Sequence, residues 1–131
     1  MKILVIEDHP PQLKLANRVL TAAGLEVTDA EAAEEAFLTL KRDRPEVILL
    51  DLSLPGMDGL ALVRKLRADP ETCDIPVVAV TAFHEMFPKA AALEAGCDAY
   101  LIKPIDTRTL AEQVEAVVAK RKAMAQPKAP S

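Results

Sequence analysis

Val47-Ile48-Leu49-Leu50-Asp51 is the stretch that decides the fold, because four consecutive apolar residues run directly into an acid. Three further short runs end in a polar residue in the same way: residues 3–6 in Glu7-Asp8, 77–80 in Thr81, and 100–102 in Lys103. Such runs are typical of strands buried on both faces of a parallel sheet. Because the carboxyl ends of these strands form one crevice, we expect three carboxylates, a hydroxyl and an ammonium to meet there. This combination indicates a site for a metal ion and a phosphoryl group.

Strand and helix patterns alternate five times along the chain. We expect strands at about 2–6, 25–30, 46–50, 77–80 and 99–102, and helices at about 10–23, 31–42, 59–68, 88–95 and 107–122. Strands that are separated by helices and joined by short loops predict an α/β fold with a right-handed, doubly wound sheet. Leu15 and Leu62 fall outside the main apolar stripes of their helices, so we expect both on the surface.

The composition fits one domain with an acidic surface. The chain has 131 residues, half of them hydrophobic, and a net charge of −4. The last twelve residues carry four basic side chains and no acid, which leaves a charge of −8 on residues 1–119. An acidic body argues against direct nucleic-acid binding, which needs a basic face. It suits a site that gathers carboxylates around a divalent cation.

Cysteine usage and hydropathy predict a cytoplasmic protein. Cys73 and Cys97 have neither metal-ligand spacing nor a CxxC motif, which is typical of reduced structural thiols. The first strand begins almost at the amino terminus without a charged and then apolar leader, so we expect no secretory signal. No apolar stretch is long enough to span a bilayer, so we expect no membrane association.

Glu7, Asp8 and Asp51 end two of the predicted strands, so their carboxylates should converge. Carboxylates within a few ångströms repel one another, and without a cation at least one pKa should be raised. Mg²⁺ prefers oxygen ligands and takes one or two carboxylates together with phosphate oxygens. We therefore predict Mg²⁺ as the cofactor.

The ordered set of strand-end residues resembles the receiver domain of two-component response regulators. The resemblance rests on Glu7-Asp8, Asp51, Thr81-Ala82 and Lys103-Pro104, together with the motif Asp51-x-x-x-Pro55-x-Met57-Asp58-Gly59. It implies the flavodoxin/CheY-like (βα)5 fold, a five-stranded parallel sheet with strand order 2-1-3-4-5. It covers about residues 1–119, so we expect a receiver domain at 1–122 and a flexible tail at 123–131. Residues 76–83 and 97–100 further resemble small single-domain regulators of bacterial cell-cycle signalling.

The resemblance also assigns roles to the acids. It implies that Asp51 is the nucleophile and becomes an aspartyl phosphate. It implies that Mg²⁺ is held by Asp8, Asp51 and the backbone carbonyl of Ser53, with Glu7 acting through water.

The resemblance also assigns roles to residues in or after the fourth and fifth strands. The resemblance implies that Lys103 and the Thr81 hydroxyl contact phosphoryl oxygens, and that Thr81 and Tyr100 form a coupled switch pair. It also implies a cis bond between Lys103 and Pro104. Phe83, two residues beyond the threonine, offers no hydrogen bond to an attacking water, so we expect it, together with Ser53, to slow hydrolysis of the aspartyl phosphate.

Function follows from the same resemblance. We expect a domain that takes a phosphoryl group from a sensor histidine kinase or a histidine phosphotransfer protein, changes the face formed by helix four, strand five and helix five, and acts on a downstream protein. It would be a monomer or a phosphorylation-dependent dimer. It would be a self-phosphorylating, slowly autodephosphorylating switch rather than a turnover enzyme.

Four alternatives stay open at this point. The domain can be a relay intermediate that passes the group to a second histidine, or an interaction module that works without phosphate. Modules of that kind usually lack one of the acid pair, Asp51, Thr81 or Lys103. A hydrolase of the haloacid type would need an acid where Ser53 stands. An FMN binder would need a Ser/Thr/Gly-rich loop at residues 7–11.

Overall fold

Apolar runs form the strands of the protein and amphipathic stretches form its helices. The computed structural model describes residues 1–54 and 57–125. The elements in chain order are β1 (Lys2–Ile6), α1 (Pro10–Ala22), β2 (Glu26–Ala30), α2 (Ala33–Arg42), β3 (Val47–Asp51), α3 (Gly59–Ala68), β4 (Val77–Thr81), α4 (Lys89–Ala95), β5 (Ala99–Ile102) and α5 (Leu110–Ala125). The expected boundaries agree with these within three residues.

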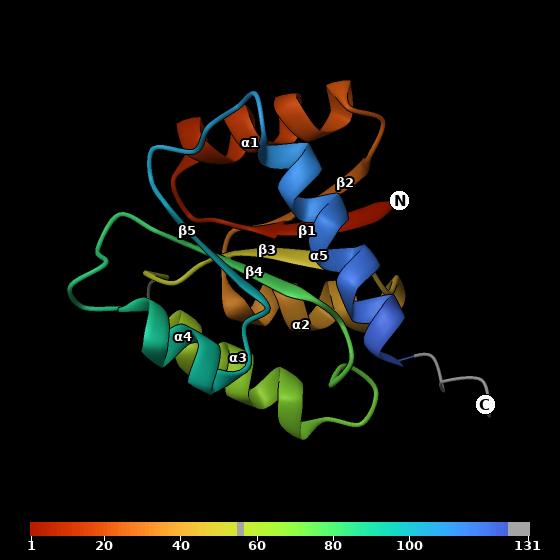
Figure 1. Ribbon diagram of the computed structural model, residues 1–131, viewed down its shortest axis with the longest axis vertical. Helices are drawn as coiled ribbons and strands as arrows, with labels where there is room; N and C mark the ends of the chain where they lie inside the picture. Colours follow the sequence, from red (N-terminus) through yellow and green to blue (C-terminus); the bar gives the residue numbers. More distant parts are fainter. Residues whose placement is uncertain (55–56, 126–131) are drawn as a thin grey trace.

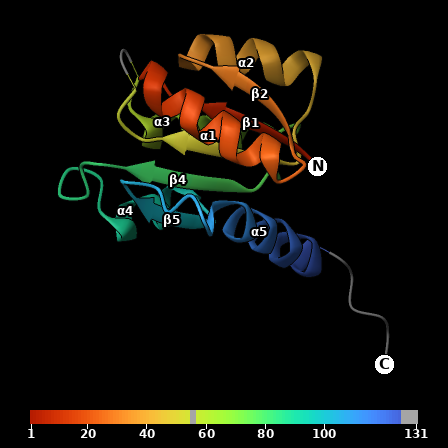
Figure 2. The same ribbon diagram turned by 90° about the horizontal axis from the view of Figure 1, so that it is seen from above.

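The five strands form one parallel sheet in the order β2-β1-β3-β4-β5, as expected. Figure 2 shows this order, with β2 at one edge and β5 at the other. The register pairs Asp51 with Val80 and Thr81 with Ile102. Because all strands run the same way, the loops that follow β1, β3, β4 and β5 lie at one edge of the sheet. This carboxyl edge carries the candidate site.

The sheet separates two hydrophobic cores. Helices α1 and α5 pack on one face, over the side chains of Ile3, Val5, Leu49 and Val80. Helices α2, α3 and α4 pack on the other face (Figure 1), where every second residue of the same strands is buried. Alternation of strand side chains between faces accounts for this division. Below, the two cores are called the α1/α5 core and the α2–α4 core.

Two expectations about burial were wrong. Leu62 is fully buried, because it lies on the inner stripe of α3 with Val63 and Leu66. β5 is only partly buried, and Ile102 is 52% exposed, because this strand pairs on one side only. Leu15 is exposed, as expected.

A cluster of charges ties the opposite, amino edge of the sheet together. Asp98 precedes β5, and its carboxylate accepts hydrogen bonds from Arg67 of α3 at 3.0 Å and from Arg121 of α5 at 2.9 Å. The same carboxylate accepts the Val77 N–H at 2.8 Å. Arg67, Asp98 and Arg121, called here the basal cluster, therefore fasten helices from both cores to the start of β4 and β5. Within the described residues, no helix has the length and hydropathy needed to cross a membrane.

Candidate functional site

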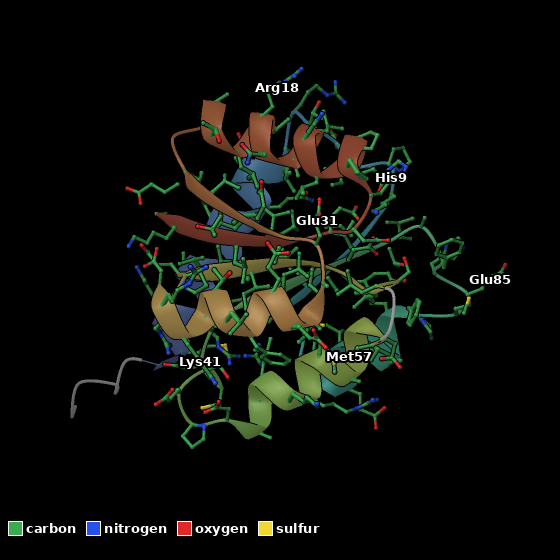
Figure 3. All side chains as sticks on the ribbon, turned by 180° about the vertical axis from the view of Figure 1, so that it is seen from behind. His9, Arg18, Glu31, Lys41, Met57 and Glu85 are labelled. Atoms are coloured by element: carbon green, nitrogen blue, oxygen red, sulfur yellow. The ribbon has the colours of Figure 1, made fainter. Side chains whose placement is uncertain are left out.

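Three carboxylates meet at the carboxyl edge of the sheet, as the sequence predicts. Ligand oxygens of Glu7, Asp8 and Asp51 all lie within 4.8 Å of one another. Glu7 and Asp51 are each only 5% exposed, whereas Asp8 faces solvent. Figure 3 shows His9, Met57 and Glu85, which lie in three of the surrounding loops, at one end of the molecule and Lys41 toward the other.

Lys103 is held among these acids. Its ammonium donates to Glu7 Oε1 at 2.5 Å, to Asp51 Oδ2 at 3.0 Å and to the side-chain oxygen of Gln12. The lysine side chain is 11% exposed, so these contacts are largely shielded from solvent. The peptide bond between Lys103 and Pro104 is cis, which confirms the expectation.

The pKa of Glu7 is the most displaced of the cluster. Burial and the neighbouring Asp51 carboxylate together raise it to about 7, against the opposing effect of Lys103. Burial also disfavours the charged form of Asp51, but contacts with Glu7, the Ser53 N–H and Lys103 outweigh burial and lower its pKa. Burial likewise works against charged Lys103, but hydrogen bonds to Glu7 and Asp51 leave its pKa raised. At neutral pH the site therefore holds an ionised Asp51, an ammonium and a half-protonated Glu7.

The loop after β3 orients Asp51. The Ser53 N–H donates to Asp51 Oδ1 at 3.0 Å and the Ser53 hydroxyl donates to the same oxygen at 3.1 Å. Asp58 caps α3 by accepting the Ala61 N–H at 2.7 Å. A Cβ on Gly59 would lie 2.5 Å from the Cα of Leu52, so the helix start packs directly on the loop backbone. Pro55 of the sequence motif lies outside the described residues.

Thr81 and Tyr100 lie on neighbouring strands and on the same side of the sheet. Thr81 pairs with Ile102 and Ala79 with Tyr100, so both side chains face the α2–α4 core. The Thr81 hydroxyl is fully buried and accepts the Phe83 N–H at 2.9 Å. The Tyr100 hydroxyl donates to the Phe87 carbonyl at 2.5 Å, just before α4. Each member of the predicted switch pair therefore has a backbone partner.

The donor set fits Mg²⁺. Glu7, Asp8 and Asp51 offer only carboxylate oxygens, the ligand type that this hard cation prefers. Lys103 is their one cationic contact among the described residues, so three ionised acids would carry two more charges than it neutralises. A divalent cation removes that excess.

Sequence reasoning missed two contacts of the site. The Ser53 hydroxyl donates to Asp51, a hydrogen bond that was not expected. Gln12 was not singled out, although Pro10 and Pro11 start α1 and so place position 12 in the first turn. His9 and His84, both at the loops around the site, are exposed.

Residues 3–115 match the model of the response regulator receiver domain family. The chain belongs to this family, and it is a receiver domain of the kind found in response regulators of two-component signalling.

Named relatives agree with this assignment. The chain is 40% identical over 116 residues to Response regulator PleD of Caulobacter vibrioides, a match that covers 88% of this chain and 26% of PleD. It is 32% identical to Protein PilH of Pseudomonas aeruginosa, with 90% of this chain and 98% of PilH covered. The chain thus spans about a quarter of the length of PleD and nearly all of PilH. A crystal structure of a putative response regulator from Chloroflexus aurantiacus superposes with a TM-score of 0.85 at 32% identity, covering 90% of this chain and 97% of that one.

Proposed function

We propose that this receiver domain accepts a phosphoryl group on Asp51 and acts as a phosphorylation switch. The observation that carries the proposal is the environment of Asp51: a buried, ionised carboxylate in contact with Lys103 and within ligand distance of two further acids. An interaction module that works without phosphate has no need of this arrangement.

Asp51, Ser53 and Lys103 have different roles in the proposed phosphoryl transfer. One carboxylate oxygen of Asp51 attacks phosphorus, and the bond from phosphorus to the donor nitrogen or oxygen breaks with its electron pair going to the donor. Ser53 fixes Asp51 Oδ1 with two hydrogen bonds, which leaves Oδ2 beside the lysine. Lys103 supplies positive charge next to the phosphoryl oxygens, because positioning and charge neutralisation are the main needs of this reaction.

Glu7, Asp8 and Asp51 are the side chains that would hold Mg²⁺, together with the Ser53 carbonyl. When bound, the ion neutralises charge on the carboxylates and on the incoming phosphoryl group. The half-protonated state of Glu7 fits this role, because the carboxyl group gives up its proton when a cation enters.

Thr81 and Tyr100 supply the switch. We infer that the Thr81 hydroxyl leaves the Phe83 N–H and donates to a phosphoryl oxygen, and that Tyr100 leaves the Phe87 carbonyl and moves toward the space so opened. The resulting change in packing alters the face made by α4, β5 and α5.

The donor is a sensor histidine kinase or a histidine phosphotransfer protein, and the output is a downstream protein that recognises the altered face. The domain catalyses its own phosphorylation and slow dephosphorylation but is not a turnover enzyme. It binds neither nucleic acid nor membrane directly, and it is a monomer or a phosphorylation-dependent dimer. Free thiols at Cys73 and Cys97 fit a reducing compartment, so we place the protein in the cytoplasm. A relay role is the second candidate, since transfer from Asp51 to another histidine uses the same site.

Incubation with acetyl phosphate and Mg²⁺, followed by intact-mass measurement, tests the proposal. The wild type should gain the mass of one phosphoryl group, and Asp51→Asn should gain none. Asp29→Asn is the matched control, because Asp29 is an exposed acid on β2 and an amide there can keep its contact with Asn17. A wild type that gains no phosphate, or an Asp51→Asn variant that does, overturns the proposal.

A further inference from the structure

Gln12 makes a contact that neither the family motif nor the proposed roles account for. Its side-chain oxygen accepts a hydrogen bond from the Lys103 ammonium, beside the bonds to Glu7 and Asp51. An ammonium group has three N–H donors and no acceptor. All three donors are therefore used: two by acids at strand ends, and one by a neutral amide on α1.

The geometry of α1 directs this amide into the site. Gln12 and Ala16 are four residues apart and so share one face of the helix, and Ala16 is buried in the α1/α5 core. Gln12 also borders a small hollow of about 10 Å³ that Glu7 and Asp51 line as well. The glutamine is half-buried, so its bond to the ammonium is partly shielded from solvent. This is a contact inside the site and not a surface pairing.

A neutral acceptor at this position has a specific effect on the lysine. If only Glu7 and Asp51 held the lysine, its ammonium would move toward whichever of the two carboxylates is ionised. Once Asp51 carries a phosphoryl group, the N–H that pointed to Oδ2 needs a phosphoryl oxygen as its acceptor. With Gln12 and Glu7 holding the other two N–H groups, the ammonium stays over Asp51 and its third N–H remains directed at the site of the phosphoryl group. Gln12 does this without adding a fourth negative charge to the cluster.

We propose that Gln12 is a positioning residue for phosphoryl transfer, which acts by holding the Lys103 ammonium over Asp51. The proposal rests on the phosphoryl transfer proposed above and concerns how fast that transfer occurs. Gln12 does not touch the phosphoryl group, so its effect passes entirely through Lys103.

The first test compares phosphorylation rates at saturating acetyl phosphate and Mg²⁺. Gln12→Met keeps the length of the side chain and removes the acceptor, so the rate should fall on the order of tenfold, as for one lost hydrogen bond to a charged group. Gln12→Glu restores an acceptor at the same reach but adds the fourth negative charge that Gln12 avoids, so its rate should lie between the rates of Gln12→Met and the wild type. Arg18→Met is the control on the same helix, because Arg18 points outward, away from the site (Figure 3).

Two further readouts separate positioning from a structural effect. In a Lys103→Met background the ammonium is absent, so adding Gln12→Met should change the remaining rate by less than about twofold. In the metal-free protein, the Lys103 ammonium hydrogens should exchange with water several-fold faster in Gln12→Met than in the wild type, as measured by NMR. The midpoint of thermal unfolding and the midpoint of a Mg²⁺ titration of Gln12→Met should stay close to those of the wild type.

The outcomes distinguish the two proposals. If the wild type is phosphorylated and Gln12→Met is phosphorylated equally fast, the positioning role is wrong and the proposed function stands. An equal loss of rate with and without Lys103, or slow ammonium exchange in both proteins, also overturns the positioning role. If the wild type gains no phosphate, the proposed function fails and the positioning role fails with it.

Discussion

Replacing Glu7 with glutamine should remove most of the dependence of stability on pH between about 4.5 and 7. The ordinary pKa of this carboxyl is 4.5, and in the folded protein burial and the nearby Asp51 raise it to about 7. Between these values the folded state keeps a proton that the unfolded state has lost. Raising the pH through this window therefore lowers the free energy of unfolding.

The size of the effect follows from the shift. Each pKa unit corresponds to about 1.4 kcal/mol, so the wild type should lose up to about 3 kcal/mol of stability across the window. The pKa of Asp51 lies below its ordinary 3.8 and that of Lys103 lies above its ordinary 10.5, so both groups titrate outside it. Glu7→Gln is neutral at every pH, so its stability should change much less over the same range.

The free energy of unfolding of both proteins can be measured by urea unfolding at several pH values between 4.5 and 8. Far-UV circular dichroism is the signal, since the chain has no tryptophan to report unfolding by fluorescence. Glu115→Gln, at an exposed position of α5, is the control and should behave like the wild type. Adding Mg²⁺ should stabilise the wild type more at pH 8 than at pH 5, because the ion competes with the proton on Glu7. Parallel stability curves for the wild type and Glu7→Gln would refute the reasoning.

Three further substitutions test other contacts. Gly59→Ala should lower the free energy of unfolding by at least about 1 kcal/mol, because the new Cβ would lie 2.5 Å from the Leu52 Cα; a variant as stable as the wild type in urea would contradict that close approach. Asp98→Ala should lower it by about 2–4 kcal/mol, because it removes the only carboxylate that pairs with both arginines of the basal cluster among the described residues, and the acceptor of the Val77 N–H. Its control, Asp43→Ala in the exposed pair with Lys2, should change it by less than about 1 kcal/mol; equal effects would count against the cluster. Phe83→Glu should speed loss of the phosphoryl group several-fold, measured by intact mass after acetyl phosphate is removed, because the side chain is 53% exposed beside the site and glutamate can orient a water; an unchanged rate would rule this out.

Much of the fold and of the site could be predicted from the sequence, because the strands are easy to recognise in it. Uninterrupted apolar runs that end in Glu7, Asp51, Thr81 and Lys103 predict a buried parallel sheet, and parallel strands must bring those ends to one edge. The same topology brings the carboxylates of Glu7, Asp8 and Asp51 close enough together to hold a metal ion.

What the sequence did not predict depends on helix rotation and on edges. Leu62 seemed to fall off the stripe of its helix because the stripe was centred one residue away, on Leu60, Val63 and Leu66. The exposure of Ile102 follows from the position of β5 at the edge of the sheet, which the expected strand order implied but the apolar content of residues 100–102 does not show. Gln12 was missed for a related reason. A polar residue in the first turn of a helix is common, and only the position of the Lys103 ammonium shows that this one belongs to the site.

The division of the interior by the sheet has a consequence for communication through the protein. Asp51 follows Leu49 on the side of the α1/α5 core, whereas Thr81 follows Ala79 on the side of the α2–α4 core. A phosphoryl group bound by both residues would bridge the two cores that the sheet separates at this edge. On the proposed function, phosphorylation on one side of the sheet would then be converted into a rearrangement of side chains on the other side, at the edge opposite to the one that the basal cluster holds together.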